Sequence, residues 1–267
     1  MLADQQVWVR GAGELGSAVA HLLHRVGFHV FISEISPPLA IRRPVTFSDA
    51  ILDGESEVEG IEAKRVSSLT LSQSKPWDYI PLFYDDPDII RSLNPSVIVD
   101  ARMLKQYDED FRDWSELFIG LGPGFSVDLN CHRVIETMRG HDLGRVIHSG
   151  SPLADTGIPG TLGGENSKRL IRASHTGQVN WTFDFGDRVD QGQEIASFND
   201  GEPILAPISG IIRGMISSRV KVHPGMKIGD IDPRGDTVNY QKISEKARTI
   251  ASGVFEAIVI HQKDKRQ

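Results

Sequence analysis

The amino-acid sequence predicts an α/β protein with a parallel sheet in its first 120 residues and a mostly β region after it. Short apolar runs alternate with stretches of helical periodicity in the first part, as in parallel sheets with crossover helices. From about residue 120 to 235 the helical periodicity disappears, and glycine and proline recur every few residues, which is typical of short strands joined by turns. We therefore expect one domain over residues 1–120 and a second over residues 121–267.

Composition and charge narrow the class of protein. The chain has 267 residues, with 29 Lys and Arg against 36 Asp and Glu, and a formal net charge of −7. A broad nucleic-acid surface usually carries a basic excess, so we expect no nucleic-acid partner. No run approaches the roughly 18–20 apolar residues of a membrane-spanning helix, and the first residues lack the pattern of a signal peptide. We expect a cytoplasmic protein without a membrane partner, and a homodimer as the commonest oligomer.

A glycine motif follows the first expected strand. Residues 7–10 are an apolar run, and the next six residues read Gly11-Ala-Gly-Glu-Leu-Gly16. The spacing of the apolar residues after the motif predicts a helix, and residues 29–34 read as the next strand. Gly11 permits a tight turn, Gly13 lets a phosphate approach the backbone, and Gly16 lets the helix pack closely on the sheet. This pattern predicts a Rossmann-like nucleotide-binding domain with phosphates at the helix N-terminus. The alternative is a tight turn that binds nothing.

Charged residues near the ends of neighbouring strands complete the expected cofactor site. Glu34 ends the second strand, and its carboxylate is suited to a ribose diol, which favours NAD over NADP. Arg42 and Arg43 follow closely enough to blur that preference. Asp100 and Arg102 follow a later buried strand, and we expect them either in the same crevice or as a helix cap and a surface charge.

A turn-rich segment after residue 120 gathers side chains that transfer protons or bind anions. Arg139 and Arg145 are suited to hold a phosphate or carboxylate in bidentate fashion. Glu136 and His141 are suited to exchange protons, because an unperturbed histidine titrates near pH 6.5. These four residues are the candidate catalytic group, and a solvated, salt-bridged β surface is the alternative. We expect no metal site, because no metal-binding spacing appears, and we expect the single cysteine, Cys131, in the core.

Two similar units occur at about residues 180–235. Val189–Ile195 and Val222–Ile228 share the pattern Val-x-x-Gly-x-x-Ile, and an Ala-Pro-x-x-Gly segment lies between them. The pair resembles the half-repeats of biotinyl/lipoyl, or barrel-sandwich, domains, in which a lysine on the intervening hairpin carries the cofactor. The corresponding Ser197–Glu202 contains no lysine, so we expect no biotin or lipoyl attachment. A helix expected over 243–260 would close over a sheet or barrel.

A wider resemblance rests on segments spread over almost the whole chain: Gly11–Ser17, Ile41–Phe47, Gly122–Phe125, Val134–His141, Leu143–Arg145, Thr156–Gly160, Ile228–Asp236 and Ile243–Arg248. With them the chain resembles the accessory proteins of selenium-dependent molybdenum hydroxylase systems (YqeB type). Its first domain is also similar to the nucleotide-binding part of XdhC-type molybdenum cofactor maturation proteins. The resemblance implies a maturation factor that binds NAD or a molybdopterin dinucleotide, with a molybdenum hydroxylase or a selenium donor protein as partner.

Two other functions stay open at this point. A freestanding NAD-dependent oxidoreductase would use His141 or His148 as its acid or base. A non-enzymatic docking module would use the barrel at about 180–235 and the C-terminal helix. The sequence leaves open whether the chain catalyses a reaction.

Overall fold

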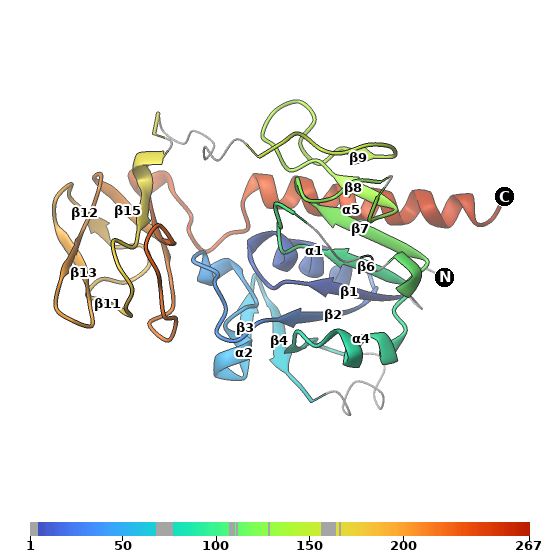
Figure 1. The fold of residues 1–267 in the computed structure, drawn as a ribbon, viewed down its shortest axis with the longest axis horizontal. Helices are drawn as coiled ribbons and strands as arrows, with labels where there is room; N and C mark the ends of the chain where they lie inside the picture. The colour runs from blue at the N-terminus through green and yellow to red at the C-terminus, as the bar shows by residue number, and fades with distance from the viewer. Residues whose placement is uncertain are drawn as a thin grey trace. The chain divides into compact units, whose positions relative to one another are not determined.

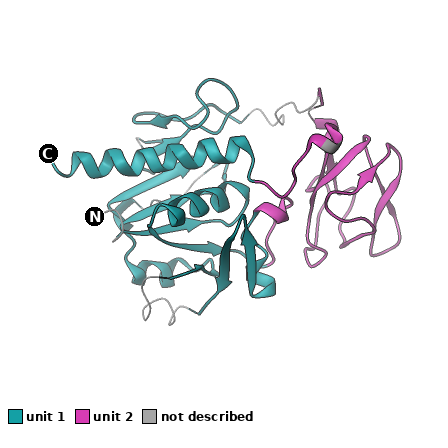
Figure 2. Ribbon diagram, turned by 180° about the vertical axis from the view of Figure 1, so that it is seen from behind, with its two compact units in different colours: residues 1–36, 46–156, 243–267 teal, residues 37–45, 157–242 magenta. Residues whose placement is uncertain are grey.

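The computed structural model describes residues 5–67, 77–106, 110, 112–127, 129–155, 164–165 and 167–267. Contacts divide the chain into two compact units (Figure 2). Unit 1 comprises residues 1–36, 46–156 and 243–267, and unit 2 comprises residues 37–45 and 157–242. This division differs from the predicted boundary at residue 120, because the chain up to residue 156 and the C-terminal helix both pack with the first sheet.

Unit 1 is built on a nine-stranded mixed sheet in the order β3-β4-β5-β2-β1-β6-β7-β8-β9 (Figure 1). Its strands are β1 (Gln6–Arg10), β2 (His29–Glu34), β3 (Glu55–Val58), β4 (Ile61–Arg65), β5 (Ile80–Tyr84), β6 (Val97–Asp100), β7 (Leu117–Leu121), β8 (Arg133–Ile135) and β9 (Val146–Ile147). Neighbouring strands from β4 to β8 are parallel, whereas β3 and β9 pair antiparallel at the two edges. The parallel strands therefore all end at the same edge of the sheet.

Helices cover both faces of this sheet. Helices α1 (Glu14–Arg25) and α5 (Glu245–Asp264) run side by side on one face (Figure 1), and they share a core with strand residues such as Val9, Ile32 and Val99. Trp8, Phe31 and Ile98 point to the other face, where they pack with Ile90 of α4 (Pro87–Leu93). Alternate residues of each strand thus serve opposite cores, as the period of a strand requires. A short helix, α2 (Ala50–Asp53), precedes β3.

Unit 2 consists of two antiparallel sheets. One has the order β10-β16-β15-β12, and the other has the order β11-β13-β14. The strands are β10 (Leu170–Arg172), β11 (Val179–Trp181), β12 (Arg188–Val189), β13 (Glu194–Phe198), β14 (Pro203–Leu205), β15 (Gly210–Met215) and β16 (Lys227–Asp232). Short 3-10 turns complete the chain: η2 (Arg43–Val45), η3 (Arg112–Trp114), η4 (Ser167–Arg169) and η5 (Gly235–Thr237). The two Val-x-x-Gly-x-x-Ile repeats at 189–195 and 222–228 place their valines and isoleucines in one apolar core: Val189, Ile195, Val222 and Ile228.

These observations correct the predicted fold class. The prediction was a Rossmann-like parallel sheet followed by a β domain with a barrel-sandwich unit and a closing helix. The first sheet is instead nine-stranded and mixed, and it extends through β9, beyond the predicted boundary. The described residues contain four α-helices, fewer than a sheet of regular strand–helix repeats requires. Helix α5 packs on the first sheet and is not part of the β unit.

Among the described residues, no helix is both long enough and apolar enough to cross a bilayer.

Candidate functional site

The three motif glycines lie where β1 ends and α1 begins. Gly11 has a φ of +98°, in the region that favours glycine, and its N–H donates to Ser33 O at 2.8 Å. A Cβ added to Gly16 would overlap the carbonyl oxygen of Gly11, so the helix passes directly over the loop. A Cβ added to Gly13 would meet no atom within 4 Å. Gly13 also precedes α1 without any side chain capping the helix, so the first turn faces open space.

Glu34 occupies part of this loop with its own carboxylate. Its Oε2 accepts the N–H of Ala12 at 2.7 Å, and its Oε1 accepts the N–H of Ile35 at 2.8 Å. The side chain is buried. Burial raises the pKa of Glu34, and the two backbone hydrogen bonds counteract part of that rise. Both oxygens of Glu34 bind the protein backbone, and its role as the acceptor of a ribose diol stays a prediction.

Asp100 and Arg102 lie beside Gly11 and bind each other. Arg102 donates from Nη2 to Asp100 Oδ2 at 2.6 Å and from Nε to Asp100 Oδ1 at 3.1 Å. Asp100 is fully buried at the end of β6. The Cγ atom of Arg102 would lie 3.3 Å from a Cβ at Gly11. No helix starts at Asp100, so Asp100 is not a helix cap, and the place of the pair in a cofactor crevice stays a prediction.

The four predicted catalytic residues differ in burial and in their partners. Glu136 is buried at the end of β8, where its oxygens accept the N–H groups of Met138 at 2.7 Å and Leu153 at 2.8 Å. His141 is exposed and lines a hollow together with Arg145. Proton exchange between Glu136 and His141 stays a prediction.

The two arginines of that group also have separate partners. Arg139 forms an ion pair with Glu245 of α5 at 2.6 Å, and Arg145 pairs with Asp142 at 3.0 Å on the surface. The two arginines thus pair with different acidic residues, and their binding of an anion stays a prediction. Arg139 nevertheless lies close to the first turn of α5, and Arg145 lines a shallow hollow.

Lys246 is a residue that the sequence reading missed. It lies in the first turn of α5 and is partly buried. Burial lowers its pKa, the charge of Arg139 lowers it further, and the charges of Glu14 and Glu136 act in the opposite sense. Glu14 begins α1, so these interactions gather two cations and two carboxylates near the start of both helices. A lysine in the first turn of a helix opposes the helix dipole, which is the signal that would have singled it out.

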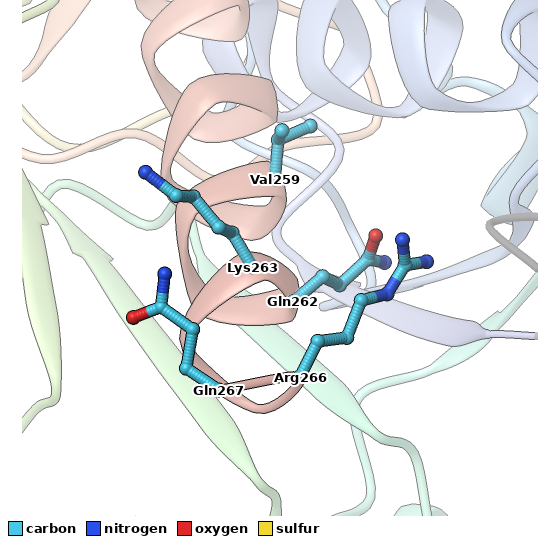
Figure 3. Close-up of a pocket in the computed structure, with 5 residues that line it drawn as sticks. All are labelled: Val259, Gln262, Lys263, Arg266 and Gln267. Atoms are coloured by element: carbon cyan, nitrogen blue, oxygen red, sulfur yellow. The ribbon is translucent and has the colours of Figure 1, made fainter.

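Two hollows lie along α5. The first, of about 430 Å³, lies between the loop 141–145 and α5 and includes the predicted residues His141 and Arg145. There the loop crosses the helix closely, because a Cβ at Gly253 would overlap the carbonyl oxygen of Gly144. The second, of about 390 Å³, lies at the end of α5 between long polar side chains and Val259 (Figure 3).

Three remaining expectations concern metals, the cysteine and a glycine segment. Among the described residues, no three His, Cys, Asp or Glu side chains are grouped so as to hold a metal ion. Cys131 is buried, and burial raises the pKa of its thiol to about 12, so it is a core residue. The segment Thr156–Gly160 lies outside the described residues.

The hairpin expected to lack a carrier lysine joins β13 to β14. Its residues Ser197–Glu202 contain serine, phenylalanine, asparagine, aspartate, glycine and glutamate. The absence of a biotin or lipoyl group stays a prediction.

Comparisons with known proteins place the chain near one curated sequence. It is 41% identical over 258 residues to a protein of Escherichia coli (strain K12) named "Uncharacterized protein YqeB". The alignment covers 96% of this chain and 48% of that protein, so the chain spans about half the length of its relative. This agrees with a resemblance of YqeB type. It gives no support to a selenium–molybdenum role or to an XdhC-like first domain. No protein-family model matches the chain.

The solved structures that match are distant. They include an aspartoacylase family protein from Mesorhizobium loti, with 12% identity, a TM-score of 0.28, and coverage of 85% of this chain and 84% of that one. They also include a succinylglutamate desuccinylase/aspartoacylase from Rhodobacter sphaeroides, with 14% identity, a TM-score of 0.28, and coverage of 85% of each chain. At these scores the likeness supports no conclusion about the activity of this chain.

The curated relative gives no support to the functions predicted from the sequence. The Glu34 carboxylate, which the sequence assigned to a ribose, accepts the N–H groups of Ala12 and Ile35. The assignments as a maturation factor and as an NAD-dependent oxidoreductase are not retained, and the docking module stays a prediction.

Proposed function

We propose that unit 1 binds a small anionic molecule through a phosphate or carboxylate group at the N-terminus of α1. The observation that carries this proposal is the uncapped first turn of α1 at Gly13, which faces open space. The first N–H groups of a helix have no acceptor within the helix and together carry about half a positive charge, so the start of the twelve-residue α1 attracts negative charge.

The surrounding charges support an anion at this position. Lys246 lies in the first turn of α5 and interacts electrostatically with Glu14, the first residue of α1, and Arg139 pairs with Glu245 beside Lys246. The carboxylates nearby have partners of their own: Asp100 binds Arg102, and Glu136 binds the backbone of its loop. An incoming anion therefore meets helix amides and the side chain of Lys246, beside the carboxylates of Glu14 and Glu34. NAD and a molybdopterin dinucleotide, the cofactors predicted from the sequence, are two members of this wider class of ligands.

Calorimetric titration of the full chain tests the proposal. The ligands are pyrophosphate, AMP, NAD and a dicarboxylate such as succinate, each at two salt concentrations. We expect at least one to bind, with an affinity that falls as salt rises. Gly13→Val adds a side chain over the amides and should weaken binding at least tenfold, whereas Gly13→Ala should weaken it less. Both variants should fold, because Gly13 has a φ of −67° and free space around it. The proposal fails if none of the four ligands binds, or if Gly13→Val leaves the affinity unchanged.

A further inference from the structure

A pocket of about 320 Å³ lies at the ends of β4 and β5. It is lined by Arg65, Val66, Ser67, Phe83, Tyr84 and Ile89. Its volume falls within the range of small-molecule sites, which start at about 300 Å³. Since β4 and β5 are parallel neighbours, their last residues bring Arg65 and Tyr84 to the same edge of the sheet. The first residues of α4 close one side through Ile89.

The walls of this pocket are mostly apolar and aromatic. Tyr84 is 53% exposed although it is a large aromatic residue. Phe83 is buried and packs against Phe31 with ring centroids 5.7 Å apart, so it provides a fixed floor. Val66 and Ile89 add aliphatic surface. A flat ring placed against Tyr84 would bury apolar area on both partners, and aromatic pairs prefer such offset stacked arrangements.

Arg65 adds a positively charged group in a fixed position. Its Nη1 donates to the carbonyl oxygen of Ile51 in α2 at 2.8 Å. This hydrogen bond holds Nη1 of an exposed arginine that also lines the pocket. A guanidinium that is held in place loses less freedom when it binds a carboxylate or phosphate.

The acidic residues next to the pocket are engaged with other groups. Asp85 follows Tyr84 and binds Arg10 at 2.9 Å and the Ser33 hydroxyl at 2.7 Å. Asp86 accepts the N–H groups at the start of α4. Asp85 and Asp86 are therefore less available to bind Arg65 in place of a ligand.

From this arrangement we propose that the pocket formed by Arg65, Val66, Phe83, Tyr84 and Ile89 is a binding site for a small planar aromatic acid. The ring lies against Tyr84 and the aliphatic side chains, and the carboxylate or phosphate binds Arg65. The site involves different residues from those of the anion site at Gly13, so each proposal stands or fails by itself.

The test uses the full chain and three kinds of probe in ligand-observed NMR and calorimetry. The probes are an aromatic acid (4-hydroxybenzoate), a neutral ring of the same size (4-hydroxybenzyl alcohol) and an acid without a ring (acetate). We expect 4-hydroxybenzoate to bind most tightly. The neutral ring should bind about tenfold more weakly, which is on the order of what one charged hydrogen bond contributes. Acetate should show no saturable binding below about 10 mM, because it lacks the ring.

Two variants separate the roles of ring and charge. Tyr84→Ala should weaken 4-hydroxybenzoate at least fivefold, since Tyr84 is largely exposed and its removal leaves the core in place. Arg65→Gln should weaken the acid about tenfold and leave the neutral ring unchanged. Arg145→Gln is the matched control, because Arg145 is exposed and precedes β9 at the opposite edge of the sheet from β4. It should change the affinity of neither the acid nor the neutral ring. Gly13→Val should also leave 4-hydroxybenzoate binding unchanged.

Two results would overturn the inference. One is the absence of saturable binding of 4-hydroxybenzoate at millimolar concentration. The other is binding that Tyr84→Ala and Arg65→Gln both leave intact, which would place the ligand elsewhere. Loss of binding in Gly13→Val alone would likewise assign the aromatic acid to the α1 site and not to this pocket.

Discussion

The Glu34 carboxylate holds the backbone N–H of Ala12, so the end of β2 fixes the glycine loop between β1 and α1. The distance from Glu34 Oε2 to Ala12 N is 2.7 Å, and the other oxygen binds Ile35 N at 2.8 Å. An acidic residue at the end of the second strand therefore acts on the protein backbone here. The loop is shaped before any ligand arrives.

Replacing Glu34 should destabilise unit 1. Glu34→Ala leaves the buried N–H of Ala12 and the partly buried N–H of Ile35 without their acceptor, and we expect the free energy of unfolding to fall by about 1–3 kcal/mol. Glu34→Gln keeps one acceptor oxygen and should cost less. Urea unfolding followed by circular dichroism measures both. Equal stability of Glu34→Ala and wild type would contradict the role assigned to this side chain.

Two glycines of the same motif should respond in opposite ways to alanine. Gly16→Ala forces a methyl group into the carbonyl oxygen of Gly11, and we expect a loss of at least about 2 kcal/mol despite the better helix propensity of alanine. Gly13→Ala meets open space and should change stability by less than about 0.5 kcal/mol. Thermal unfolding of the two variants side by side gives the comparison. The account of the loop is wrong if the two variants melt together.

Buried histidines should make unit 1 sensitive to acid. Burial lowers the pKa of four of them: His21, His24, His132 and His261. The unfolded chain binds protons near pH 6.5, so their contribution to stability is complete above that pH and is lost as the pH falls through the lower folded values.

His21 offers the cleanest variant, because it is buried on α1 and hydrogen-bonds to the backbone of Glu59. We expect His21→Gln to reduce the difference in unfolding free energy between pH 7.5 and pH 5, because the lowered pKa of His21 no longer contributes to it. Denaturant titrations at the two pH values measure it. An unchanged difference would show that His21 gains its proton as readily folded as unfolded.

A buried ion-pair network should stabilise unit 2. Arg213 binds Asp232 at 3.0 Å, Arg234 binds the same carboxylate at 2.7 Å, and Arg169 binds Asp230. Burial alone would raise the pKa of Asp232, but the hydrogen bonds from Arg234 and Arg213 hold it well below its usual range. Its contribution is therefore present above about pH 4 and is lost as the pH falls further.

Removing one member of this network tests its strength. Asp232→Ala leaves Arg213 buried beside a missing partner, and we expect a loss of about 3–5 kcal/mol. Asp200→Ala, at an exposed aspartate of the same unit, is the control. Hydrogen exchange of β15 and β16 amides reports on the unit directly. Protection that matches wild type in Asp232→Ala would contradict the proposed contribution.

Local elements were predictable from the sequence. The helix expected after the glycine motif is α1, the strand expected at 29–34 is β2, and the helix expected over 243–260 is α5 with bounds Glu245–Asp264. Each of these depends on the periodicity of nearby apolar residues, which a single sequence displays.

Pairing between distant segments was not predictable in the same way. The strand β5 lies between β2 and β4, and the final helix packs on α1 more than two hundred residues away. The spacing of apolar residues shows that α5 has an apolar face, but it does not indicate which part of the protein packs against that face. The same limit applies to the site. The position of Asp100 followed from a strand end, whereas the hydrogen bonds that Glu136 accepts from Met138 and Leu153 depend on how the loops after β8 and β9 fold.

The binding of an anion at the start of α1 is tested most directly by titrating pyrophosphate into the full chain labelled with ¹⁵N. We expect saturable changes in the amide signals of Glu14, Leu15 and Gly16, a smaller change near Lys246, and none at Lys263 near the far end of α5. The changes should vanish in Gly13→Val. Amide signals of residues 14–16 that stay fixed while others move, or a spectrum that does not respond at all, would contradict the account.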